Sequence, residues 1–114
     1  MKASDLFVKC LEAEGVTKIF GIPGEENADL MISLKKSKIE FVLCRHEQAA
    51  AFMADVYGRL TGKAGVCLAT LGPGVTNLMT GLADANMDRA PVVAIIGQGS
   101  TERLHKESHQ IMDS

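Results

Sequence analysis

The chain has 114 residues, of which 46% are hydrophobic and 23% are charged, and its formal net charge is -2. This length allows one domain with one core, and the small net charge gives no electrostatic reason to expect nucleic acid or an anionic membrane as a partner. No apolar run is long enough to span a bilayer, and charges interrupt the amino-terminal segment, so we expect a soluble cytoplasmic protein.

The first half of the chain predicts two helices and two strands. Apolar residues recur at helical spacing from Ala3 to Leu11, and Gly15 can end this helix in the left-handed conformation. A short strand at 17–20 runs into a turn rich in glycine and proline at 21–24. Acidic residues then begin a second helix that runs to about Ser37, and a strand follows at 39–44.

The second half continues the alternation of helices and strands. A helix lies within 44–62 and is broken by Gly62, and a β-branched strand follows at 64–70. Another helix begins near Val75, and a continuous apolar strand spans 90–99. The polar segment from residue 100 onward lacks a clear period and is predicted to be a loop or the start of a connection.

The order of these elements predicts an α/β fold, a parallel sheet with helices on both faces. Ligands of such sheets bind beyond the carboxyl ends of the strands, where loops and helix starts converge. Four segments should meet there: 21–24, 45–48, 70–74 and 97–99.

Glu47 is the strongest acid–base candidate at this edge. A glutamate in the first turn of a helix can simply stabilise the helix dipole. However, the residues that follow, from Ala49 to Ala54, make the helix apolar on most of its circumference, which predicts that it is buried and its first turn enclosed. An enclosed carboxylate can exchange a proton with a bound base near neutral pH.

Two other motifs are weaker. The segment Gly72-Pro73-Gly74 lacks both the third glycine of a dinucleotide fingerprint and the lysine of a phosphate loop, so it either lets backbone approach a flat ring or is only a tight turn. His105 and His109 are four residues apart, but no third ligand is evident and a solvated segment is favoured over a metal site. Cys10, Cys44 and Cys67 lack metal or redox spacing and are predicted to be buried free thiols in a reducing cytosol.

Three stretches together resemble a known family. They are "FGIPGEEN" (20–27), "RHEQAAAFMADVYGRLTGKAGVCLATLGPGVTNLMTGLADANMDRAPVVAIIGQ" (45–98) and "RLHKESHQIMD" (103–113). They resemble the amino-terminal, pyrimidine-binding domain of thiamine-diphosphate enzymes, most closely the large subunit of acetolactate synthase. The resemblance implies a Rossmann-like thiamine-diphosphate-binding fold over residues 1–114, incomplete at its carboxyl-terminal side, without the central and diphosphate-binding domains.

The resemblance also implies roles for individual residues. Glu47 would bond a ring nitrogen of the aminopyrimidine and favour its imino tautomer, which takes the proton from the thiazolium carbon. Positions that match the pyrimidine site are Pro23, Thr70, Pro73 and Asn77, and positions that match the substrate region are Gly24 and Gln98. No metal ligand is expected in this chain, since Mg²⁺ and the diphosphate would be held by the missing carboxyl-terminal domain.

The implied reaction joins pyruvate, after decarboxylation, to a second 2-oxo acid and gives acetolactate or acetohydroxybutyrate, for branched-chain amino acids or acetoin. The alternatives are another thiamine-diphosphate decarboxylase, oxidase or carboligase, and, for the isolated chain, an inactive association domain. The resemblance leaves open whether the full-length protein binds FAD and whether it has a regulatory subunit.

The resemblance implies a homodimer or larger homo-oligomer. The small residues Ala50, Ala54, Gly81 and Ala85 either permit close helix packing across the subunit contact or pack within one domain.

Overall fold

A single parallel sheet organises the chain. The computed structural model describes residues 1–106 and 109–111. Its strands are β1 (Lys18–Gly21), β2 (Glu40–Leu43), β3 (Gly65–Ala69) and β4 (Val92–Ile96), in the order β2-β1-β3-β4 with every pair parallel. The predicted α/β fold is therefore confirmed, with each strand close to its predicted position.

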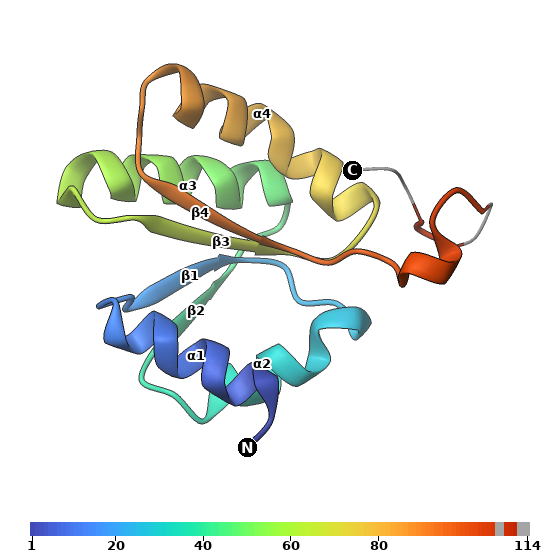
Figure 1. Cartoon of the computed structure of the whole chain (residues 1–114). Coiled ribbons are helices and arrows are strands. Elements are labelled where there is room, and N and C mark those ends of the chain that lie inside the picture. Colours follow the sequence, from blue (N-terminus) through green and yellow to red (C-terminus); the bar gives the residue numbers. More distant parts are fainter. Residues whose placement is uncertain (107–108, 112–114) are drawn as a thin grey trace.

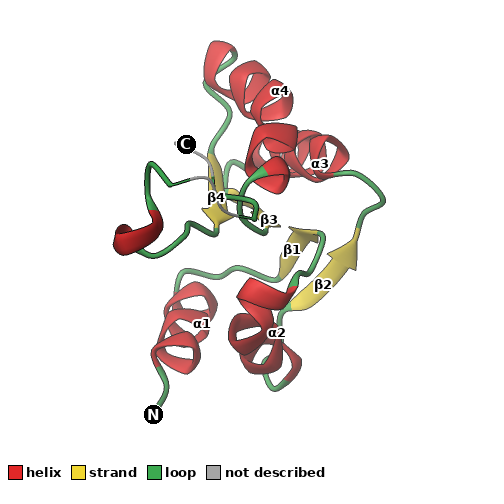
Figure 2. Cartoon of the chain, turned by 90° about the vertical axis from the view of Figure 1, so that its right-hand side faces the viewer, coloured by secondary structure: helices red, strands yellow, loops and turns green. Residues whose placement is uncertain are grey.

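Helices cover both faces of this sheet (Figure 1). The helices are α1 (Ala3–Ala13), α2 (Ala28–Lys35), α3 (Glu47–Thr61) and α4 (Pro73–Met87), with short 3₁₀ turns η1 (Glu25–Asn27) and η2 (Thr101–Arg103). α1 and α2 lie on one face, whereas α3 and α4 lie on the other (Figure 2). No helix among the described residues is long and apolar enough to cross a membrane.

The core has one apolar cluster on each side of the sheet. On the side of α1 and α2, Val8 and Leu34 pack with Ile19 and Val66. On the other side, small alanines of α3 pack with Cys67 and with Leu78 of α4. Because every residue of β3 is buried, this strand is the centre of the fold, as its uniformly apolar sequence predicts.

The ends of α3 follow from local sequence. His46 is the N-cap, and its Nδ1 accepts a hydrogen bond from the Gln48 N–H at 3.0 Å. The helix ends at Gly62, which has a φ of 69°, a conformation that favours glycine. Glu47 is therefore fixed as the first helical residue, immediately after the loop 44–46 that follows β2.

Of the two uses predicted for the small residues of α3 and α4, the structure supports packing within the chain. A Cβ added at Gly81 would lie 2.5 Å from the Cβ of Ala51, which means that the two helices touch there. Ala50 and Ala54 are fully buried in the same cluster, and Ala85 is also buried. Because α3 and α4 pack closely, these small residues are buried between the two helices.

Two burial predictions were wrong. α3 was predicted to be buried, but its side chains Met53, Val56 and Leu60 are 43%, 50% and 81% exposed. Its first turn is only partly enclosed, since Glu47 is half-buried and Gln48 is exposed. Cys10 is exposed rather than buried, while Cys44 and Cys67 are buried, and all three are free thiols. An alanine-rich sequence gives little signal about which face of a helix is covered, since alanine occurs on both.

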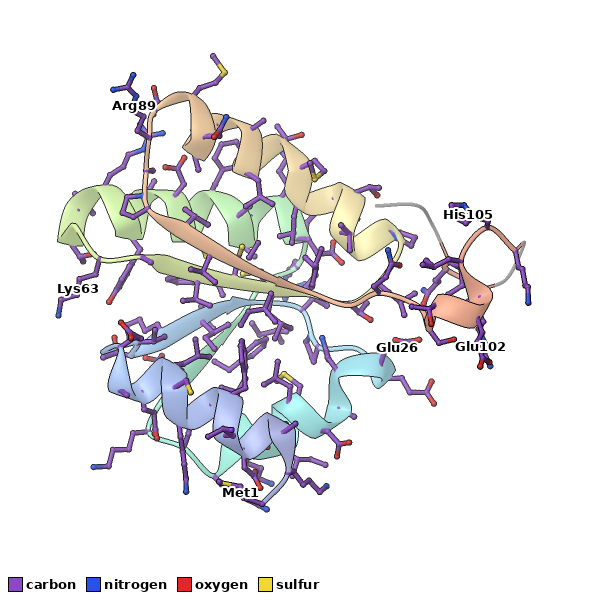
Figure 3. All side chains as sticks on the ribbon, viewed as in Figure 1. Met1, Glu26, Lys63, Arg89, Glu102 and His105 are labelled. Atoms are coloured by element: carbon purple, nitrogen blue, oxygen red, sulfur yellow. The ribbon has the colours of Figure 1, made fainter. Side chains whose placement is uncertain are left out.

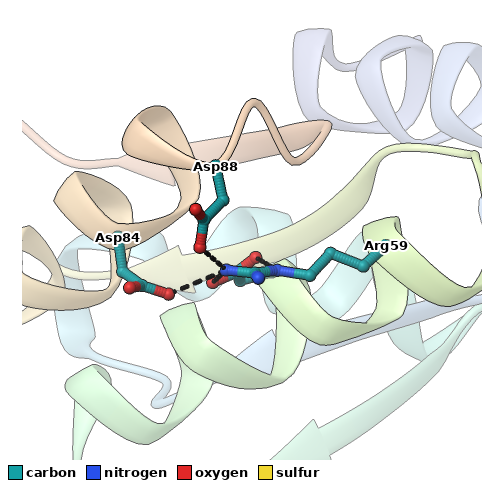
Figure 4. Close-up of polar contacts among 4 residues, drawn as sticks. Arg59, Asp84 and Asp88 are labelled. Atoms are coloured by element: carbon teal, nitrogen blue, oxygen red, sulfur yellow. Dashed lines mark hydrogen bonds and ion pairs between the residues drawn. The ribbon is translucent and has the colours of Figure 1, made fainter.

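An arginine cluster ties α3 to α4 (Figure 4). Arg59 donates from Nε to Asp55 Oδ1 at 2.7 Å and from Nη2 to Asp55 Oδ2 at 3.0 Å. The same Nη2 contacts Asp84 at 2.9 Å and Asp88 at 2.7 Å. Asp55 is only 1% exposed, so the bidentate guanidinium compensates a carboxylate that is removed from water.

This cluster predicts a pH dependence of stability. The hydrogen bonds from Arg59 hold the pKa of Asp55 below its ordinary value of 3.8. The stabilisation from Asp55 is therefore fully present above pH 3.8 and is lost as the pH falls through its lower folded-state pKa. The Asp55 carboxyl raises the pKa of Asp84 above its ordinary value of 3.8. Asp84 therefore affects the stability above pH 3.8, whereas Asp55 affects it below pH 3.8.

We expect Asp55→Asn to flatten the loss of stability below about pH 4, measured by urea unfolding of the chain at several pH values. Glu102→Gln, an exposed carboxyl outside the cluster, is the control and should keep the wild-type profile. An unchanged acid profile in Asp55→Asn would show that this ion pair does not contribute to acid unfolding.

Candidate functional site at the carboxyl ends of the strands

The loops that follow the four strands converge at one edge of the sheet, because all of the strands are parallel. These loops are 22–24 after β1, 44–46 after β2, 70–72 after β3 and 97–99 after β4. Figure 2 views the molecule from this side. The predicted meeting of the four segments is confirmed by the topology.

Glu47 and Asn77 form the central polar pair of this edge. The Asn77 side chain donates from Nδ2 to Glu47 Oε2 at 3.0 Å, and both residues are half-buried. A Cβ at Gly74 would lie 3.5 Å from Glu47 Oε1, so the start of α4 passes beside the carboxylate. No side chain or backbone N–H of the described residues donates to Oε1, which leaves this oxygen available to a ligand.

Thr70 is the second polar side chain, and it is held by the loop after β1. Its Oγ1 donates to Glu26 Oε2 at 2.9 Å. A Cβ at Gly24 would lie only 2.7 Å from the Cβ of Thr70, so the backbone of Gly24 rests against this residue. A side chain at position 24 would displace Thr70, which is a physical reason for a glycine there.

The structure brings some predicted residues together and leaves others apart. Glu47 contacts Asn77, and Gly24 contacts Thr70. Pro23 and Pro73 are both exposed, and Pro73 opens α4. Gln98 lies beyond β4, where its Oε1 accepts a hydrogen bond from the Gly99 N–H at 3.0 Å.

The segment after β4 returns to this edge. A Cβ at Gly72, where φ is 64°, would lie 2.5 Å from the carbonyl oxygen of Gln110. A Cβ at Gly99 would collide with the Ile111 side chain. Figure 3 shows Glu102 and His105 on the same side of the molecule as Glu26. The segment predicted as a plain loop therefore covers the turn before α4.

A metal centre would need several titratable side chains to come together as ligands. No group of three His, Cys, Asp or Glu side chains within 1–106 and 109–111 could hold a metal ion. Part of the segment between His105 and His109 lies outside the described residues. A cavity of about 340 Å³ lies at the opposite end of the sheet, near Val16 and Tyr57. We favour the carboxyl edge as the site because it gathers the acid–base side chains.

The comparison with family models decides the identity of this domain. The model described as "Thiamine pyrophosphate enzyme, N-terminal TPP binding domain" matches residues 1–114. The chain belongs to this family. The resemblance found in the sequence is thus confirmed, and thiamine diphosphate is the cofactor of the domain type.

Relatives within the thiamine pyrophosphate enzymes agree on one activity. The chain is 46% identical over 114 residues to a "Probable acetolactate synthase large subunit" of Methanocaldococcus jannaschii, covering 100% of this chain and 19% of the relative. It is 48% identical over 113 residues to "Acetolactate synthase isozyme 2 large subunit" of Escherichia coli K12, covering 99% and 21%.

A plant relative is still more similar in sequence. The chain is 52% identical over 110 residues to "Acetolactate synthase 2, chloroplastic" of Nicotiana tabacum, covering 96% of this chain and 17% of the relative. In all three comparisons the chain spans about a fifth of the relative's length.

The sequence did not reveal that Glu26 contacts Thr70 at this edge of the thiamine-pyrophosphate-binding domain. In the sequence, Glu25 and Glu26 indicate only favourable negative charge at the start of the second helix, as many solvated acidic residues do. The bond to Thr70 joins positions 44 residues apart in the chain. Its only signal in the sequence is that Glu26 closely follows a strand that ends at the ligand-binding edge.

Proposed function

We propose that this chain is the N-terminal part of a full-length acetolactate synthase in which Glu47 faces the aminopyrimidine of thiamine diphosphate. The observation that carries the proposal is the Glu47–Asn77 pair at the converging loops of a domain whose relatives are acetolactate synthases. Bound thiamine diphosphate would supply a carbon nucleophile that adds to the keto carbon of pyruvate.

The side chains at the edge fit an aminopyrimidine. A carboxyl group that is anchored through one oxygen has its other oxygen fixed in direction, so Glu47 Oε1 can hold or pass a proton at a ring nitrogen. Gly24 and Gly74 keep side chains away from Thr70 and from the Glu47 carboxylate. In this proposal Pro23, Pro73 and Thr70 surround the ring.

The proposal also covers the substrate positions, the diphosphate and the location of the protein. Gly24 and Gln98 would lie nearest to the 2-oxo acid substrates, and a separate domain would hold the diphosphate and Mg²⁺. A cytoplasmic location is part of the proposal, because the three free cysteines are typical of a reducing compartment.

We also propose that the full-length protein is a homo-oligomer. The exposed residues Met53, Val56 and Leu60 are three and four positions apart, so they form one apolar stripe along α3. Apolar stripes of this kind favour contact with another protein surface. The stripe lies on different residues from the small ones that pack α3 against α4.

The direct test is product analysis. The full-length protein, supplied with pyruvate, thiamine diphosphate and Mg²⁺, should form acetolactate, whereas the isolated 114-residue chain should consume no pyruvate. Carbon dioxide and acetaldehyde without acetolactate would favour a decarboxylase instead. Turnover by the isolated chain would overturn the proposal that other domains are required.

A further inference from the structure

Glu26 and Thr70 form a contact between two separate loops of the site. Thr70 follows β3 directly, and Glu26 belongs to the 3₁₀ turn η1 after β1. The hydroxyl of Thr70 donates to Glu26 Oε2 at 2.9 Å. Figure 3 places Glu26 at the carboxyl end of the sheet, toward the segment with Glu102 and His105.

The loop that carries Glu26 is itself fixed. Gly24 rests on Thr70, since a Cβ at Gly24 would lie 2.9 Å from Thr70 Oγ1. The Gly24 N–H donates to Asn27 Oδ1 at 2.8 Å, which closes the turn around Glu26. Gly24 and Asn27, on either side of Glu26 in the sequence, are thus joined by a hydrogen bond, and Gly24 lies against Thr70.

This contact sets the direction of the Thr70 hydroxyl proton. An ionised carboxylate can only accept hydrogen bonds, whereas a hydroxyl has one proton to give and two lone pairs. Hydrogen bonds from the Glu26 backbone and from the Thr70 hydroxyl lower the pKa of Glu26, so its carboxyl is ionised at neutral pH. With the proton committed to Glu26, Thr70 offers only lone pairs to a ligand.

We propose that Glu26 is a positioning residue that fixes the Thr70 hydroxyl as a hydrogen-bond acceptor for an N–H group of the bound aminopyrimidine. This inference rests on the proposed function, since it needs an amine-bearing ring at the edge of the sheet. Glu26 acts through Thr70 and has no role in proton transfer. The acidic residue Glu25, which precedes it, is exposed and has no side-chain partner among the described residues.

The contact itself can be tested in the chain alone. The Glu26 carboxyl carbon can be titrated by ¹³C NMR in wild type, Thr70→Val and Thr76→Val. Thr70→Val should raise the pKa of Glu26, because a donor to the ionised form is lost. Thr76, whose hydroxyl donates to the carbonyl of Pro73, is the matched control and should leave it unchanged. An unshifted pKa in Thr70→Val overturns the inference.

The role in binding needs the full-length protein. Calorimetry with thiamine diphosphate and Mg²⁺ should give a dissociation constant about fivefold higher in Glu26→Ala, the effect of one oriented hydrogen bond. Glu25→Ala should bind like wild type. Glu26→Ala should raise the KM for the cofactor more than it lowers kcat.

The double variant decides whether Glu26 acts through Thr70. Glu26→Ala with Thr70→Val should bind no more weakly than Thr70→Val alone, because the acceptor is already gone. Additive losses, or equal binding by Glu26→Ala and Glu25→Ala, would overturn the inference while the proposed function stands. Failure of wild type to bind the cofactor would overturn the proposed function and this inference with it.

Discussion

Replacing Glu47 with glutamine in the full-length protein should lower turnover by about 10²–10⁴-fold, the usual range for loss of a positioned acid–base group. Glutamine keeps the size and the hydrogen bond from Asn77 but cannot hold an exchangeable acidic proton. The comparison of kcat for wild type and Glu47→Gln, with saturating pyruvate and cofactor, measures the effect.

The matched control is Glu25→Gln, which makes the same chemical change on an exposed residue of η1. Its kcat should equal that of wild type. Thermal unfolding of both variants should show an intact fold, because neither carboxylate is part of the core clusters. Comparable turnover in Glu47→Gln and Glu25→Gln would rule out acid–base work at Glu47.

Leu78→Ala should have the largest effect on stability. Leu78 is 0% exposed and joins α4 to the alanine cluster of α3, so its removal leaves a cavity between two rigid helices. Such changes cost about 2–5 kcal/mol. Urea unfolding of the chain gives the difference in the free energy of unfolding.

Met79→Ala is the neighbouring control for this measurement. Met79 is 53% exposed, so truncating it should change the free energy of unfolding by no more than about 0.5 kcal/mol. A small effect for Leu78→Ala, equal to that of Met79→Ala, would contradict the packing of α4 against α3.

The fold could be predicted because local signals and the order of elements agree. Gly15 and Gly62 have positive φ where the sequence predicts helix ends, and β3 is apolar throughout because both of its faces are covered. Once the strands are known to be parallel, the convergence of their following loops is a matter of topology. That reasoning also places Glu47 at the edge of the sheet.

Side-chain pairing across the chain could not be predicted in the same way. The Glu26–Thr70 and Glu47–Asn77 contacts join residues 44 and 30 positions apart, and no periodic pattern encodes them. The contact of Gly81 with Ala51 is similar, because small residues allow close packing without saying with which surface. These features depend on how closely the loops and helices approach one another, which only the packed structure provides.

Bound thiamine diphosphate offers the most direct test of whether Glu47 is coupled to the cofactor. The rate at which the proton on its thiazolium carbon exchanges with deuterium can be followed by NMR after acid quench of the full-length protein. We predict fast exchange in wild type and a rate close to that of free cofactor in Glu47→Gln. Equal, fast exchange in both proteins would contradict the role of Glu47.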